Sequence, residues 1–373
     1  MTQPEQGSTS GGVVGRGSVG TGSSTGGSAP AGLSAGGSVA DVKLPEYPDF
    51  LPTVHVPVVS DDQRELLRVL HALPIMFAVN TLNMRLAASQ DPVRKADDAV
   101  TWLTSMAAKL LANNGMMELL MHSISVAHIR AIVMGTIGWQ ISPERAGTSE
   151  ALAPSPYHQN GPGTYIATIS IQGCQGKGLS GNEYKHLADK VALYLMAYEA
   201  SQLPEEQRTQ TMTDALEWAY FVDSYYAQRQ AKLGTSAFLE SADSYNKVAL
   251  LERNFRSFHA CTIPLDPDAH LVQGMSYVGC AARDMTERSS FHLQSSQYEG
   301  SYYTWWLTMS CTRDMGLQPV VRIIHAIRTW EPKQLPISEV LVTVLARSLV
   351  EDCGFNAWPP GDVTDSITKS PRD

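Results

Sequence analysis

The side chains best suited to nucleophilic chemistry are His259 and Cys261, which lie close together in the sequence. A cysteine hydrolase needs the imidazole within hydrogen-bonding reach of the thiol, together with backbone donors for the oxyanion. Residues two apart point to opposite sides of a strand, so these two could not pair there, and no oxyanion-hole sequence accompanies them. The motif H-E-x-x-H is absent from the chain, and G-x-S-x-G occurs only within the Gly/Ser-rich N-terminal stretch, at 22–26 and 32–36. This spacing therefore does not support covalent catalysis.

The glycine-rich stretch GCQGKGLSG, residues 173–181, stands between a strand pattern and a helix pattern, where proteins often bind phosphate. In the P-loop pattern, Ser or Thr follows the Gly-Lys pair, and another Gly precedes the pair by about five residues. Here Gly178 follows Lys177, and Ile171 holds the earlier position. We interpret the stretch as a flexible turn and not as a nucleotide site.

Asp266, Asp268 and His270 alternate along the chain and would point three ligands in one direction if the segment were extended. The composition of a proline-containing loop explains them equally well. The histidines are otherwise spread singly, and His122 and His128 fall on opposite faces of a helical pattern, where we expect hydrogen-bonded core or interface residues. We therefore predict no catalytic residue, no metal ion and no cofactor, and we expect that the protein is not an enzyme.

Charge is scarce in this sequence. Charged residues make up 17 % of the 373 residues and apolar residues 43 %, whereas about a quarter of a typical chain is charged. A surface short of charge is typical of a protein that covers itself with copies or partners. The net charge is -9, and Lys and Arg are scattered in ones and twos, so the sequence has no electrostatic footprint for a phosphate backbone.

The cysteines and the N-terminus indicate an intracellular protein. Five cysteines lie far apart with neither a C-x-x-C pair nor zinc spacing, so we expect reduced core residues. The N-terminus has no basic and apolar regions of the kind that form a signal peptide. The longest uncharged apolar run, residues 72–79, is too short to span a bilayer. We expect no contact with membranes.

Helical patterns dominate the chain. At its centre, one pattern runs from the N-cap Asp91 to a stop at 113–115, and a second covers 117–133, which together predict an antiparallel helical hairpin. Capping boxes open helices at Ser60 and Ser180. Further helices are expected at 61–73, 75–88, 181–198, 213–233, 238–258, 319–327 and 336–354, a strand at 165–171, an irregular segment at 262–283, and a strand pair or an aromatic wall at 298–310.

These elements predict a mainly α fold, α+β at most, with long loops and few short strands. Residues 1–42 are built mostly from Gly, Ser, Thr, Ala and Val, which predicts a disordered arm because little apolar surface offsets the entropy of ordering. Residues 43–60 are proline-rich and predict an extended strap over the domain or a neighbouring subunit. The helical body covers 61–365, and 366–373 form a flexible tail. Within the body, 142–163 predict a surface loop, which either is simply mobile or protrudes as a subunit contact.

In overall plan, the arm GSTSGGVVGRGSVGTGSS and the strap LPEYPDFLPTVHVP on a helix-rich body resemble the capsid proteins of small double-stranded RNA viruses, the partitivirus-like ones of plants and fungi. The resemblance implies a mainly helical subunit with shell and protruding regions, an inward-facing arm, and a closed icosahedral shell built on dimers. It also implies location in the virion and the host cytoplasm, with weak or indirect contacts to viral RNA and polymerase. An arm whose only basic residue is Arg16 fits a stiff duplex genome that needs no condensation by coat charges.

Two other functions stay open. A nucleocapsid or filament protein that coats single-stranded RNA would need a basic groove, which this sequence forms only if scattered basic residues converge in the fold; the candidates are Arg64, Arg68, Arg85, Lys109 and Arg130. A cytosolic enzyme would need acidic or Cys/His side chains that come together in a pocket from distant parts of the chain.

Overall fold

A computed structural model describes residues 59–88, 106–149, 151–153, 161–226, 231–293 and 302–360. The predicted arm and tail, and all of the strap before residue 59, lie outside the described residues. The described chain is mainly helical with one small sheet, which confirms the predicted fold class. Its main elements are α1 (Asp61–Ala72), α2 (Ile75–Ala88), α4 (Asn114–His122), α5 (Val126–Val133), α6 (Ile137–Gln140), β1 (Gly163–Ile171), α7 (Gly181–Ser201), α8 (Gln210–Asp223), α9 (Ala242–Thr262), β2 (Ser276–Ala281), α10 (Met285–Ser289), α11 (Tyr303–Asp314), β3 (Pro319–Arg328) and α12 (Gln334–Ala346).

The sheet has the order β2-β1-β3, and both pairs are antiparallel. The strand predicted at 165–171 is confirmed as β1, which begins two residues earlier and lies in the middle of the sheet. Nearly every β1 residue is buried, on both faces, because helices cover both sides. A register shift between Thr164 and Tyr165 interrupts the pairing of β1 with β3.

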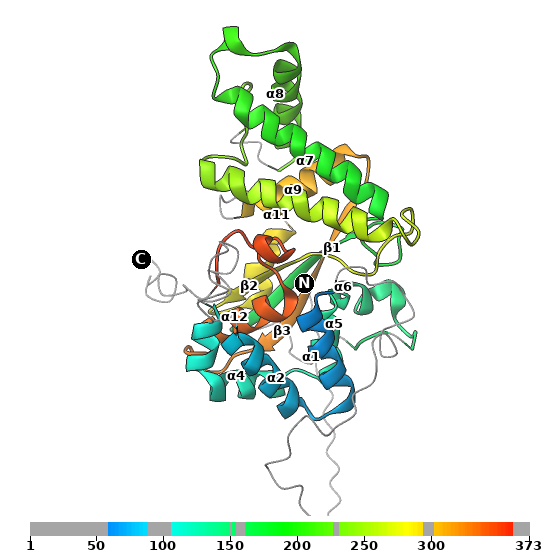
Figure 1. Ribbon diagram of the computed structural model, residues 1–373, viewed down its shortest axis with the longest axis vertical. Coiled ribbons are helices and arrows are strands. Elements are labelled where there is room, and N and C mark those ends of the chain that lie inside the picture. The colour runs from blue at the N-terminus through cyan, green and yellow to red at the C-terminus, as the bar shows by residue number, and fades with distance from the viewer. Residues whose placement is uncertain are drawn as a thin grey trace, which may run out of the picture. The chain divides into compact units, whose positions relative to one another are not determined.

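Alternate side chains of β1 belong to two separate hydrophobic cores. Ala167 and Ile171 belong to a core formed mainly with α7, α8, α9 and α11, whereas Ile166 belongs to a core formed mainly with α1, α2, α4, α5 and α12. Figure 1 shows these two groups of helices on opposite sides of the sheet. The strand therefore separates two helical layers, each of which buries its own apolar face.

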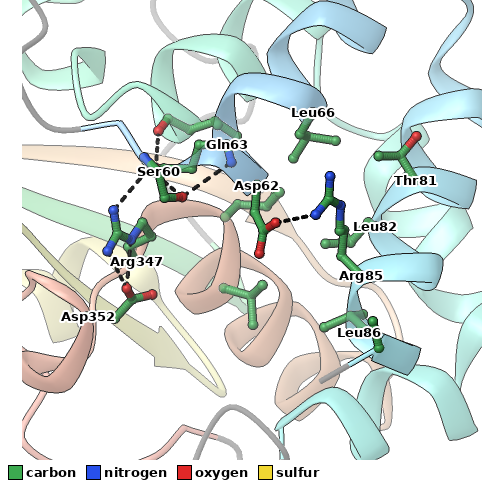
Figure 2. Close-up of a pocket in the computed structure, with 14 residues that line it drawn as sticks. Ser60, Asp62, Gln63, Leu66, Thr81, Leu82, Arg85, Leu86, Arg347 and Asp352 are labelled. Carbon is green, nitrogen blue, oxygen red and sulfur yellow. Dashed lines mark hydrogen bonds and ion pairs between the residues drawn. The ribbon is translucent and has the colours of Figure 1, made fainter. Parts of the chain in front are cut away.

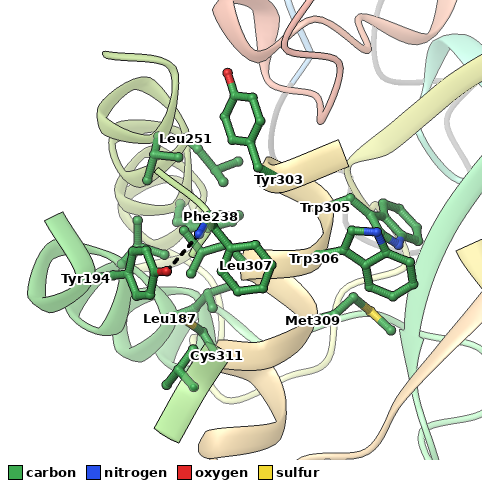
Figure 3. Close-up of a cluster of buried hydrophobic side chains, with 14 of the residues drawn as sticks. Leu187, Tyr194, Phe238, Leu251, Tyr303, Trp305, Trp306, Leu307, Met309 and Cys311 are labelled. Carbon is green, nitrogen blue, oxygen red and sulfur yellow. Dashed lines mark hydrogen bonds between the residues drawn. The ribbon is translucent and has the colours of Figure 1, made fainter. Parts of the chain in front are cut away.

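The first core is rich in aromatic side chains, as Figure 3 shows around α11. Trp305, Trp306 and Leu307 are buried on α11, and every residue from Tyr303 to Thr312 is buried. Tyr194 of α7 packs near Phe238, with their ring centroids 5.9 Å apart. Because aromatic rings bury large areas, this layer contributes strongly to the burial of apolar surface.

The predicted capping boxes are confirmed. The Ser60 hydroxyl accepts the Gln63 N–H at the start of α1, and the Ser180 hydroxyl accepts the Glu183 N–H at the start of α7. A third box, which the sequence analysis missed, opens α9 at Ser241. The helix predicted at 75–88 is also confirmed as α2.

The helix predicted at 319–327 is wrong, because this segment forms the strand β3 and pairs with β1 over its whole length. Its apolar side chains recur at helical spacing, but the run VVRII is rich in β-branched residues, which favour strands. A strand with apolar side chains on both faces cannot be told from a helix by spacing alone.

The strand pair considered for 298–310 is also wrong where this segment is described, because α11 begins at Tyr303. The aromatic-wall alternative fits better, since its tryptophans line the first core. Threonines are tolerated within α11 because the Thr308 and Thr312 hydroxyls donate to carbonyls four residues earlier.

The predicted central hairpin differs in its second half. The pattern at 117–133 is divided into α4 and α5, which are bent by 107° at residues 123–125. The break has a local cause, since the Ser125 hydroxyl accepts the His128 N–H and starts a new helix. Of the first helix, only 106–112 are described, and they are helical.

No single described helix has the length and apolar composition to cross a membrane, although the bent pair of α4 and α5 together does.

Other predicted boundaries shift. The described part of the helix predicted at 213–233 is α8, which ends at Asp223. The segment predicted as irregular at 262–283 contains β2. The last helix, α12, ends at Ala346 and not near Gly354, because Arg347 adopts a left-handed conformation that closes it.

A buried carboxylate joins α7, α8 and the segment before α9. Asp223 is fully buried, accepts a hydrogen bond from the Tyr194 hydroxyl and another from the Ala237 N–H at 2.8 Å. The Tyr194 oxygen in turn accepts the Phe238 N–H at 3.1 Å. Burial raises the pKa of Asp223 to about 7, against the lowering effect of the hydrogen bonds from Tyr194 and Ala237.

We predict a pH dependence of stability from Asp223. Because its pKa is higher in the folded chain than in the unfolded chain, the folded state binds more protons between about pH 4 and pH 7. The contribution of Asp223 to the free energy of unfolding therefore falls as pH rises through this window, by up to about 4 kcal/mol. Urea unfolding of wild type and Asp223→Asn at a series of pH values measures this contribution. The stability of Asp223→Asn relative to wild type should rise from pH 4 to pH 7, because the variant lacks this titration, whereas Asp214→Asn, on the exposed side of α8, should keep the wild-type slope. Equal slopes for wild type and Asp223→Asn would contradict the assignment.

Candidate functional site

A cavity of about 320 Å³ lies between α1, α2 and α12 (Figure 2). Its apolar lining comes from all three helices and from the end of α5: Leu66, Leu82, Leu86, Ala88, Val133, Val344 and Leu345. Polar side chains lie at its edge: Ser60, Asp62, Gln63, Thr81, Arg85, Arg347 and Asp352. A cavity of this size with a few polar groups is large enough for a small ligand.

The charged side chains of this cavity neutralise one another. Arg85 Nη1 lies 2.5 Å from Asp62 Oδ1, and Arg347 Nη2 lies 2.5 Å from Asp352 Oδ1. The Gln63 side chain connects three segments, since its Oε1 accepts from Arg347 Nη1 and from the Ser60 N–H, and its Nε2 donates to the Val133 carbonyl. These polar groups therefore hold helix ends together.

The described residues that line the cavity show no arrangement for catalysis. Among them there is no cysteine, histidine or lysine, and their four charged side chains form two ion pairs. A nucleophile next to a base, or a carboxylate beside an unpaired cation, would be needed for acid–base or covalent chemistry. The cavity can accept an apolar group, because most of its described lining that is not ion-paired is apolar.

The metal site considered for Asp266, Asp268 and His270 does not form. Asp266 accepts the Asp268 N–H, and Asp268 accepts the side-chain amide of Asn182 at 2.7 Å. His270 turns away toward the glycine-rich turn, where its Nδ1 lies 2.9 Å from the Gly178 carbonyl oxygen. Within the described residues, no three His, Cys, Asp or Glu side chains are placed to hold a metal ion.

The histidines and cysteines singled out in the sequence are also separated. His259 contacts the Gly181 carbonyl, and Cys261, two residues on, is exposed at the end of α9. His128 is hydrogen-bonded to Ser125 and to the Ala153 carbonyl, as expected, whereas His122 is exposed. Of the five cysteines only Cys311 is fully buried, so the expectation of five core residues is wrong.

The basic residues on which a single-stranded RNA groove would depend lie in one helical layer, but acidic neighbours neutralise several of them. Arg64, Arg68 and Arg85 contact Asp61, Glu65 and Asp62 respectively. Partial burial lowers the pKa of Arg130. These contacts do not favour a groove that attracts a phosphate backbone.

The glycine-rich turn packs against the segment that carries His270 and does not form a phosphate loop. Gly173 and Gly176 adopt positive φ, and Gln175 between them does so as well, which bends the chain sharply after β1. The turn places Cys174 beside His270, with Cys174 Sγ 3.3 Å from His270 Nε2. The sequence analysis missed this contact because the two residues are separated by 96 positions.

The described part of the loop predicted at 142–163 contacts the body at several points, among them the ion pair of Glu144 with Arg322 of β3. The Arg145 guanidinium stacks 3.6 Å over the Trp139 ring, and the Leu152 N–H donates to the Gln140 carbonyl. Residues 150 and 154–160 lie outside the described residues, so a protrusion of the loop stays a prediction.

Large apolar side chains are exposed on several elements. On α8, the exposed fractions of Tyr220 and Phe221 are 44 % and 52 %, and the Phe221 ring meets Tyr225 edge to face. Ile263 and Leu265 form a second exposed pair after α9, and Trp330 is exposed after β3. Contiguous exposed apolar patches mark surfaces that bind another protein, and these residues are candidates for such a surface.

Comparison with known protein families, curated proteins and solved structures finds no match to this chain.

We predict that Arg347 couples the ends of α1 and α12. Arg347→Leu should lower the free energy of unfolding by about 1–3 kcal/mol, because the change leaves Asp352 and Gln63 without their partner. The value stays modest because 41 % of the Asp352 side chain is exposed.

A double-mutant cycle with Asp352→Asn, measured by urea unfolding, tests this coupling. The two changes should together cost less than the sum of the single costs. If the costs add to within about 0.3 kcal/mol, the pair does not contribute through its contact.

Proposed function

We propose that this protein is a viral capsid subunit that assembles with copies of itself into a closed shell around an RNA genome. The observation that carries the proposal is the exposed aromatic pair on α8, Tyr220 and Phe221. Burial of such side chains in a contact between subunits stabilises that contact by about 25 cal/mol for each Å² removed from water. In a shell of identical subunits, the partner that covers this aromatic pair is a second copy of the chain.

A shell needs more than one contact surface on each subunit, since every copy meets several neighbours. Exposed apolar side chains lie at separate places on the described surface: on α2 at Met84, after α9 at Ile263 and Leu265, and after β3 at Trp330. The low charged fraction of 17 % supports the same interpretation. The resemblance to partitivirus-like capsid proteins implies dimers as the building block, in which a two-fold contact would bury the same patch on both copies.

The electrostatics favour a shell around duplex RNA over a coat on single-stranded RNA. The net charge is -9, and several basic residues of the α1 and α2 layer contact carboxylates. Such a surface neutralises few phosphates, so contacts to viral RNA and polymerase are weak or indirect. A stiff duplex confined by a shell has no need of condensation by coat charges.

We predict that the purified full chain forms uniform spheres, tens of nanometres across, that persist after nuclease treatment and at high salt. Negative-stain microscopy and light scattering, at low and high salt with and without nuclease, measure this. Filaments that collapse with nuclease would instead support the single-stranded RNA coat. A monodisperse species of one to four subunits would exclude both and favour an enzyme with a site assembled from distant residues.

A second prediction addresses α8 directly. Phe221→Glu should abolish or strongly weaken assembly, because a carboxylate in the contact would have to lose its water. The side chain is half exposed, so the variant should keep its fold, which circular dichroism and urea unfolding check.

The matched control is Thr211→Glu, which adds the same charge at an exposed position in the first turn of α8. It should assemble like the wild type. Assembly of Phe221→Glu at wild-type concentration would remove α8 from the proposed contact.

A further inference from the structure

Three residues from separate parts of the chain converge at the turn after β1. Cys174 lies in this turn, Glu183 in the first turn of α7, and His270 in the segment before β2. Cys174 Sγ is 3.3 Å from His270 Nε2, and His270 Nδ1 is 3.4 Å from Glu183 Oε2. The order of the contacts is thiol, imidazole and carboxylate, which is the order of groups in an activated nucleophile.

The hydrogen bonds around His270 determine which nitrogen faces the thiol as an acceptor. Nδ1 lies 2.9 Å from the Gly178 carbonyl oxygen, which can only accept, so the neutral ring carries its proton on Nδ1. Nε2 is then an acceptor, and the Cys174 S–H donates to it. Glu183 is itself held in place, because its Oε2 accepts the Ser180 N–H at 2.8 Å in the capping box of α7.

We propose that Cys174 is a nucleophilic thiol that accepts acyl groups from activated esters or thioesters, with His270 as its general base and Glu183 as a positioning residue. This site is independent of the proposed capsid function. It uses no residue of the α8 contact and no residue of the cavity between α1, α2 and α12.

The thiol is protonated at rest, so the proton must leave during the attack. Burial, followed by the charge of Glu183, raises the pKa of Cys174, against a lowering effect of Lys177. In the step, the S–H proton moves to His270 Nε2 as sulfur bonds to the acyl carbon. The bond from that carbon to the leaving oxygen or sulfur breaks, and the imidazolium returns its proton to the leaving group. The products are S-acyl-Cys174 and a free alcohol or thiol.

An electrophile has a route to the sulfur from solvent. Cys174 is partly exposed, and Gly173 and Gln175 on either side of it are exposed. The supports of the turn are rigid, since β1 precedes it in the middle of the sheet and a capped helix follows it. The turn that holds Cys174 is therefore anchored at both ends by regular secondary structure.

The full chain contains an internal control for thiol reactivity, because Cys261 is exposed in the last turn of α9. The probe is p-nitrophenyl acetate, and mass spectrometry of peptides follows S-acetylation at Cys174 and Cys261 separately. General-base assistance is worth about a hundredfold or more in rate. His270→Gln should therefore lower the Cys174 rate at least tenfold and leave the Cys261 rate unchanged.

The opposite result is equally clear. If the hydrogen bond only shields the thiol, His270→Gln will leave the Cys174 rate unchanged or raise it, and the proposal fails. Glu183→Gln provides a second variant, since glutamine can keep the capping box through its carbonyl oxygen. It should lower the Cys174 rate several-fold with α7 intact by circular dichroism, and an unchanged rate would remove Glu183 from the proposed role. Light scattering on the same samples reports assembly independently.

Discussion

The burial of both faces of β1 is the constraint on which the rest of the fold depends. On one face, the Thr164 hydroxyl meets Ser338 of α12 at 2.6 Å, and Thr168 packs against Gly138 of α6, where an added Cβ would lie 2.2 Å from its hydroxyl oxygen. On the other face, Tyr165 contacts His292 at 3.2 Å. A slip of one residue would exchange these faces and place every side chain of the strand in the wrong core.

The two layers that β1 separates are held together at the C-terminal end by polar contacts. Lys247 of α9 forms a buried ion pair with Glu351, and Arg347 joins Asp352 and Gln63. Asn356 pairs with β2 as a strand would, since its side chain accepts the Val278 N–H and donates to the Val278 carbonyl. This arrangement occupies backbone groups at the edge of the sheet that would otherwise be open to other strands.

The sequence predicts those features that depend on local contacts. The caps at Ser60 and Ser180 involve residues three apart, and both are confirmed. The nature of β3 depends on pairing with β1, about 150 residues earlier, and helical spacing of its apolar residues could not reveal that. The Cys174 site is less predictable still, because Cys174 and His270 are 96 residues apart in the sequence and meet only in the fold. The alternation of Asp266 with His270 suggested ligands, whereas the fold directs His270 alone toward the turn.

The surface and the interior of this chain differ in what they can do. Several charged side chains of the described chain are paired, Arg347 with Asp352 and Lys247 with Glu351, and burial raises the pKa of Asp223 to about 7. Such groups fix helix ends and leave little charge for a polyanion. Assembly through exposed apolar side chains needs no such charge, which is why the capsid proposal fits a chain with a net charge of -9. The proposed Cys174 site is compatible with the same subunit, because Cys174, His270 and Glu183 lie at the turn between β1 and α7, away from the exposed aromatic pair on α8.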